Sequence, residues 1–124
     1  MEKIMIENIV KVEFIKNKFD KIDKLIKKEN YKDAYIATAA LIEIVCMLLL
    51  SKKFNQTVDN SNIINLIKML TKNNEKEIVG ILKEINAEYN LINMDNVTEM
   101  DIIYLIGYLD EIVKEIIEKY GNIF

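Results

Sequence analysis

The sequence predicts an all-α fold, an antiparallel bundle of about five helices in one domain that spans residues 1–124. Three observations support it. Proline is absent and glycine occurs only three times, so little interrupts helical segments. Apolar residues make up 51% of the chain and recur at three- and four-residue steps, the period of an amphipathic helix. A length of 124 residues suits a single core.

The first helix is expected within residues 3–28. Lysines separate its apolar residues, which lie on one face and are predicted to enter the core: Val12, Ile15, Phe19, Ile22 and Ile26. A polar break at residues 28–30 ends this segment.

The second helix is expected over residues 31–54, where the chain is apolar almost all round. Only Thr38 and Glu43 interrupt the run from Tyr35 to Leu50, so neighbouring helices should cover most of its sides. A bilayer requires roughly 20 apolar residues, and Glu43 lies in the middle of this shorter run. The pattern therefore predicts the central helix of a bundle, with no membrane span. Cys46 lies within the run and is expected to be buried.

Two shorter helices should follow the polar joint at residues 55–60. Asn60 or Ser61 can cap a third helix that ends near Lys72. Asn73 or Asn74 can start a fourth helix, which is expected to end after Leu91. The residues of the fourth helix expected to face inward are Ile78, Ile81, Leu82, Ile85 and Tyr89.

The fifth helix is expected to begin after Thr98 and to end at Tyr120. Thr98 and Asp101 have the spacing of a capping box, and Gly121 is suited to a helix stop. Gly107 lies inside this helix, where glycine is unfavourable relative to alanine. The expected reason is close packing of Gly107 against the small residues Ala37 and Ala40 of the second helix.

The chain contains no arginine and no histidine, so all its positive charge comes from 17 lysines. Imidazole and guanidinium groups perform most general-base, metal-ligand and phosphate-clamp chemistry. Their absence predicts a protein without catalytic residues, cofactor or metal. The lysines of the first helix are interrupted by acids, so nucleic-acid binding is possible but not favoured.

Glu43 is the carboxylate that most needs an explanation, because a charge in an apolar helix must reach solvent or find a partner. No arginine is available to pair with it. A lysine, a tyrosine hydroxyl such as Tyr104, or an amide such as Asn90 could be its partner, and if none is, the pKa of Glu43 should rise. Glu43, Asn90 and Tyr104 together would form a polar pocket. A structural role for Glu43 and a functional pocket both remain open.

Two stretches resemble the HEPN (higher eukaryote and prokaryote nucleotide-binding) domains. One is the alanine-rich segment 33–43, DAYIATAALIE, and the other is the helix ending in AEYN at residues 87–90. The resemblance implies an antiparallel helical bundle, often dimeric and often a ribonuclease or a toxin–antitoxin or defence component. The ribonuclease signature of that family is Arg, a polar residue, and a His four to six places after the Arg.

Only one position of that signature agrees with this chain. Tyr89 occupies the arginine position, Asn90 fits the polar position, and Met94 or Asp95 stands where histidine belongs. Tyrosine and methionine cannot position a scissile phosphate or promote its attack. The resemblance therefore implies a non-catalytic member.

These observations together predict a non-catalytic, HEPN-like interaction module that binds a protein partner or forms a homo-dimer, in a defence, counter-defence or toxin–antitoxin setting. The alternative is a nucleotide- or RNA-binding or processing protein that uses a polar pocket around Glu43 and Asn90. The first residues, MEKIMIE, alternate charged with apolar residues and contain no signal-peptide core. A cytoplasmic location is therefore expected.

Overall fold

The computed structural model describes residues 6–58 and 62–124 and confirms the all-α bundle. Its helices are α1 (Glu13–Lys27), α2 (Tyr31–Phe54), α3 (Ile63–Lys72), α4 (Lys76–Leu91) and α5 (Glu99–Tyr120). Two short 3-10 helices, η1 (Ile9–Lys11) and η2 (Met94–Asn96), precede α1 and α5. No strand occurs in the described part of the chain.

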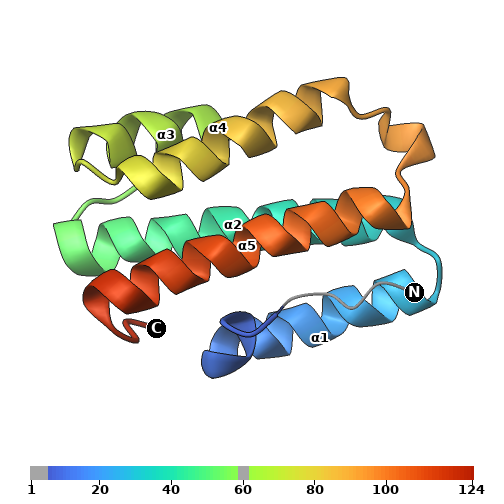
Figure 1. The fold of residues 1–124 in the computed structure, drawn as a ribbon, viewed down its shortest axis with the longest axis horizontal. Coiled ribbons are helices and arrows are strands. Elements are labelled where there is room, and N and C mark those ends of the chain that lie inside the picture. The colour runs from blue at the N-terminus through green and yellow to red at the C-terminus, as the bar shows by residue number, and fades with distance from the viewer. Residues whose placement is uncertain (1–5, 59–61) are drawn as a thin grey trace.

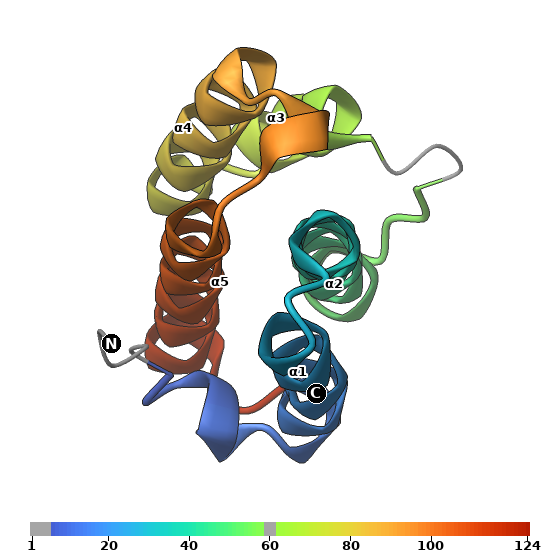
Figure 2. The same cartoon turned by 90° about the vertical axis from the view of Figure 1, so that its right-hand side faces the viewer.

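The long helices α2 and α5 pack against each other at the centre of the bundle (Figure 1). Helix α1 runs antiparallel to α2, α3 to α4, and α4 to α5, whereas α3 runs in the same general direction as α2 (Figure 1). The central pair runs in the same direction, and the rings of Phe54 and Tyr120, at the carboxyl ends of α2 and α5, meet edge to face with centroids 6.2 Å apart. Viewed end-on, α3 lies over α4 and α2, and η1 lies between α1 and α5 (Figure 2).

The core contains the apolar face predicted for the first helix, because all five residues of that face are buried. The helix itself is shorter than the predicted range 3–28. Val12 has an extended backbone and separates η1 from α1. The amides of Asn8 and Ile9 donate to the Asp110 carboxylate of α5, which holds this segment away from a continuous helix. Residues 1–5 lie outside the described residues.

The helix boundaries of α2, α5 and the end of α3 agree with the sequence prediction. The capping box is present, since Thr98 Oγ1 accepts from the Asp101 amide and Asp101 accepts from the Thr98 amide. Gly121 follows α5 with a φ of 78°, a left-handed value that favours glycine.

Two predicted helix starts need correction. The proposed caps Asn60 and Ser61 lie outside the described residues, and α3 begins after Asn62, whose side chain accepts from the Asn65 amide at 2.9 Å. The fourth helix starts at Lys76 and not at residue 73 or 74. Asn74 has a φ of 61°, a left-handed conformation that turns the chain between the two helices.

Candidate functional site

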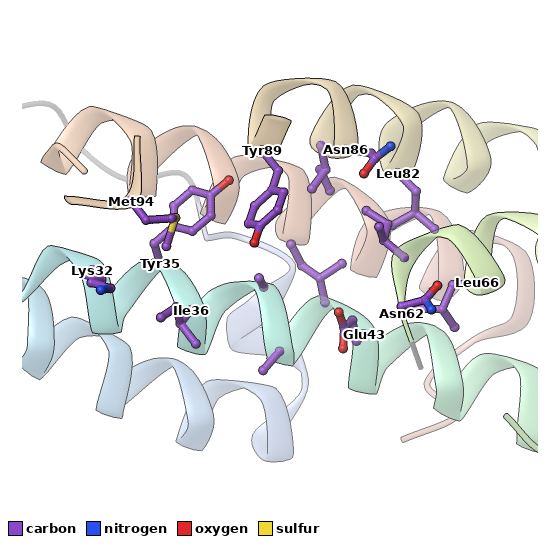
Figure 3. Close-up of a pocket in the computed structure, with 15 residues that line it drawn as sticks. Lys32, Tyr35, Ile36, Glu43, Asn62, Leu66, Leu82, Asn86, Tyr89 and Met94 are labelled. Atoms are coloured by element: carbon purple, nitrogen blue, oxygen red, sulfur yellow. The ribbon is translucent and has the colours of Figure 1, made fainter. Parts of the chain in front are cut away.

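A cavity of about 670 Å³ lies between α2, α3 and α4, and η2 borders one of its ends (Figure 3). We call it the α2–α3–α4 cavity. Helix α2 forms its floor, and its walls come from the other elements. The lining residues are Lys32, Tyr35, Ile36, Ala39, Ala40, Ile42, Glu43, Asn62, Ile63, Leu66, Leu82, Ile85, Asn86, Tyr89 and Met94. Most of these side chains are apolar, and a few polar groups are placed among them, as in small-molecule sites generally.

Two tyrosines form an aromatic wall near the η2 end of the cavity. The rings of Tyr35 and Tyr89 are stacked, with centroids 6.5 Å apart and an interplanar angle of 23°. Tyr35 is buried, and its hydroxyl bonds to none of the described residues. Burial, with a smaller contribution from the charge of Glu88, raises the Tyr35 pKa to about 12. This hydroxyl therefore stays protonated at neutral pH and can donate to a bound group.

Glu43 lies toward the other end of the cavity, beside Asn62 (Figure 3). Its side chain is half-buried, and desolvation raises its pKa above the ordinary value of 4.5. Among the described residues it has no ion-pair or hydrogen-bond partner. The cavity therefore contains a partly desolvated carboxylate that is not neutralised from within the described fold.

Lys32 lies at the opposite end of the cavity floor. Its Nζ is 4.0 Å from Asp95 Oδ1, and both side chains are exposed. Lys32 and Glu43 are separated by eleven positions of α2, which corresponds to about 16 Å at 1.5 Å per residue. The cavity is consequently elongated, with a positive group at one end and a negative group toward the other.

The structure does not bring Glu43, Asn90 and Tyr104 together in one pocket. Glu43 lines the cavity, whereas Asn90 and Tyr104 do not. Asn90 is exposed near the end of α4, and Tyr104 on α5 is 58% exposed. Asn86, one helical turn before Asn90, is the amide that reaches the cavity.

Tyr89 also differs from the prediction that it faces inward. It is 51% exposed, and its ring borders the cavity and does not enter the core. The lining residues of α4 follow the spacing i, i+3, i+4 and i+7: Leu82, Ile85, Asn86 and Tyr89. The sequence correctly predicted this helix, but these apolar residues were all expected to lie in the core. A helix face that lines a cavity and a helix face that packs in the core show the same residue spacing, so the sequence does not distinguish them.

The expected close packing of Gly107 against Ala37 and Ala40 is not present. A Cβ added at Gly107 would meet no heavy atom within 4 Å, so no neighbouring helix depends on this glycine. Ala37 is partly buried against the core, and Ala40 is exposed and lines the cavity. Ala40, together with Ala39, thus borders the cavity beside α3 and α4.

The sequence did not predict that two carboxylates, those of Glu75 and Asp110, are buried and held by hydrogen bonds. Glu75, at the start of α4, accepts from Lys119 Nζ at 3.0 Å and from the Tyr120 hydroxyl, and is only 2% exposed. Asp110 accepts from both amides described above and from Asn8 Nδ2, each at 2.9 Å. The polar spacing around these acids is ordinary for exposed helices, so the sequence carries no signal that would single them out.

The solvent-facing side of α2 carries a second feature, an apolar stripe that none of the described helices covers. We call it the α2 stripe: Ile36, Ala40, Ile44 and Met47. Ile36 is 49% exposed and Ile44 is 37% exposed. A smaller hollow of about 270 Å³ begins at Ile44 and Met47 and continues to Val58.

Helix α2 is long and apolar enough to cross a bilayer, and half of its most apolar window is buried within the bundle. The core helix of a bundle meets the same criteria of length and composition. The property is therefore weak evidence for a membrane span.

The described residues contain no group of three or more Cys, Asp or Glu side chains placed to hold a metal ion. Cys46 is fully buried, and burial followed by the charge of Glu43 raises its pKa to about 12, which leaves the thiol protonated at neutral pH. The arrangement is suited to binding by apolar contact. No family model, curated protein or solved structure matches this chain.

Proposed function

We propose that this protein is a non-catalytic helical interaction module that self-associates through the α2 stripe. The observation that carries the proposal is the exposure of Ile36 and Ile44 on the most apolar helix of the chain. Covering an isoleucine side chain is worth about 1.5–3 kcal/mol when burial is complete. A second copy of the chain presents the same stripe and can cover it.

The order of residues in the stripe suits a two-fold axis. Ala40 lies at its centre, and one isoleucine stands four positions before it and another four positions after it. When two α2 helices cross antiparallel at Ala40, Ile36 of each copy lies against Ile44 of the other. The small side chain at the centre allows the helices to approach, and the contact is isologous, as two-fold dimers require.

The non-catalytic part of the proposal rests on the side chains present. The chain lacks arginine and histidine, and Asn90, the single residue that agrees with the HEPN ribonuclease signature, is exposed. We retain from the HEPN resemblance the proposal of a protein partner in a defence, counter-defence or toxin–antitoxin setting. A cytoplasmic location is part of the same proposal.

Nucleotide or RNA binding in a pocket around Glu43 and Asn90 is the weaker candidate. Phosphate groups need positive or neutral donors, and Glu43 places a carboxylate in the cavity instead. Asn90 lies outside the lining. No observation on the described residues favours this function over self-association.

Sedimentation equilibrium of the purified chain tests the proposal. We expect a dimer at about 10 µM, the range in which a small apolar helix interface is populated. Ile44→Glu places a charge in the proposed interface and should give a monomer with unchanged helical content. Ile64→Glu is the matched control, because Ile64 is 49% exposed and belongs to α3, not to the α2 stripe.

Disulfide trapping tests the proposed two-fold axis at Ala40. Ala40→Cys should cross-link two chains under mild oxidation, since position 40 faces itself across the two-fold axis, while the native Cys46 is buried and cannot compete. Ser51→Cys, at an exposed position eleven residues further along α2, should cross-link far more slowly. A monomeric parent chain, or a dimer that Ile44→Glu leaves intact, would contradict self-association through this face.

A further inference from the structure

We propose that the α2–α3–α4 cavity binds an amphiphilic amine, with one ammonium group at Glu43 and an unbranched apolar body about 10 Å long, the rise of the seven helical positions from Ile36 to Glu43. The cavity and the α2 stripe share Ile36 and Ala40, so a dimer formed through the stripe would cover part of the cavity lining. Amine binding is therefore measured on the Ile44→Glu chain as well as on the parent chain, which separates this proposal from that of self-association.

The apolar body is accommodated by the shape and lining of the cavity. Its volume of about 670 Å³ falls within the range of about 300–1,000 Å³ that is typical of small-ligand sites. Between Glu43 and the tyrosines the floor and walls are aliphatic apart from the Asn86 amide, and are formed by side chains such as Ala39, Leu82 and Ile85. An alkyl chain lying along α2 would contact these side chains, and it carries no polar group that would need a hydrogen-bond partner.

The ammonium group is selected by Glu43. This carboxylate has no partner among the described residues, and desolvation already disfavours its charged form. A cation at this position would supply the missing partner, and the charge-assisted hydrogen bonds would be stronger than those of a neutral donor. Asn62 lies beside Glu43, but its amide oxygen accepts from the Asn65 amide as the cap of α3, so the selection of a cation at this end rests on Glu43 (Figure 3).

The opposite end of the cavity fixes the orientation of the ligand. Lys32 lies there in an exposed ion pair with Asp95, and the stacked rings of Tyr35 and Tyr89 and the thioether of Met94 offer apolar and polarisable surface for the tail. An amine with one charge and one apolar end therefore fits better than a diamine. The ammonium group points toward α3, and the tail points toward η2.

The test compares three eight-carbon probes that differ in their head group: octylammonium, octanol and octanoate. Each is titrated into the isotope-labelled chain at pH 7.5, and binding is followed by the amide shifts of lining residues such as Ala39 and Asn86. We expect octylammonium to bind about tenfold more tightly than octanol, and octanoate to bind most weakly.

Two variants locate the selectivity. In Glu43→Gln the preference for octylammonium over octanol should fall to about twofold or less. Glu84→Gln removes an exposed carboxylate of α4 that does not line the cavity, and should keep the tenfold preference. The proposal is overturned if octanol or octanoate binds as tightly as the amine, if Glu43→Gln keeps the preference, or if no probe shifts the lining residues. Ile44→Glu, which breaks the proposed dimer, should leave amine binding intact.

Discussion

Replacing Asp110 by alanine should destabilise the fold more than any single surface change, because this carboxylate anchors the amino-terminal segment to α5. It accepts from the Asn8 amide, the Ile9 amide and Asn8 Nδ2, each at 2.9 Å. Asp110 is 7% exposed and Ile9 is fully buried. In Asp110→Ala the Ile9 amide would lose its acceptor at a place that water does not reach.

The cost can be worked from these three bonds. A hydrogen bond to a charged group contributes about 1.5–3 kcal/mol net, and a stranded buried donor costs about 1–3 kcal/mol. The contributions overlap, and removal of a buried charge recovers some desolvation energy, so we expect a loss of about 3 kcal/mol. For a chain of 124 residues this corresponds to a fall in Tm of about 10 °C.

Urea denaturation followed by circular dichroism measures the loss, and amide hydrogen exchange locates it. The Ile9 amide should lose its protection in Asp110→Ala, while amides in the middle of α2 should exchange only through global unfolding. Asn8→Ala is the matched control, since it keeps both backbone donors to Asp110, removes the side-chain bond to Asp110 and an exposed bond from Lys11 Nζ, and should cost about 1 kcal/mol. If Asp110→Ala costs no more than Asn8→Ala, the anchoring role assigned to this carboxylate is refuted.

Three further substitutions test other parts of the structure. Glu43→Gln should stabilise the fold at pH 7.5. Desolvation raises the pKa of Glu43 in the native state, so its ionisation destabilises the native state as the pH rises above 4.5. The gain in urea midpoint of Glu43→Gln over the parent chain should therefore shrink toward zero as the pH falls below 4.5. Gly107→Ala should raise stability by about 0.5–1 kcal/mol, because the added Cβ meets no atom within 4 Å; a loss in thermal unfolding would reveal a contact. Tyr120→Phe should cost about 1–2 kcal/mol in urea, because it removes one donor from the buried Glu75, and an unchanged midpoint would show that Lys119 alone satisfies that carboxylate.

Much of the fold was predictable because it depends on local rules. The spacing of Ile15, Phe19 and Ile22 predicted the buried face of α1, and Thr98 with Asp101 predicted the start of α5. Helix periodicity and capping act over three or four residues, so a single sequence displays them directly. The helix starts that were wrong, at α1 and α4, depend on Asp110 and on a left-handed Asn74, neither of which has a local signal of that kind.

The candidate site was predictable only in part, because a cavity depends on what the neighbouring helices leave uncovered. Glu43 was singled out correctly as a carboxylate in an apolar run, and it lines the cavity. Asn90 was named as the candidate amide, whereas Asn86, one helical turn earlier on α4, lines the cavity and was not considered. Tyr104 was named as a hydroxyl that could partner Glu43, but the rotation of α5 exposes it.

The sequence by itself determined that this chain forms five helices, which face of α1 is buried, and that its chemistry must proceed without imidazole or guanidinium groups. Composition and periodicity are properties of the chain and do not depend on where other helices lie. Only the tertiary structure decided that α2 keeps one face uncovered, that Glu43 lies in a cavity, and that Glu75 and Asp110 are buried. Those outcomes depend on how helices distant in sequence are rotated and packed, and a residue's own neighbours along the chain do not specify that rotation.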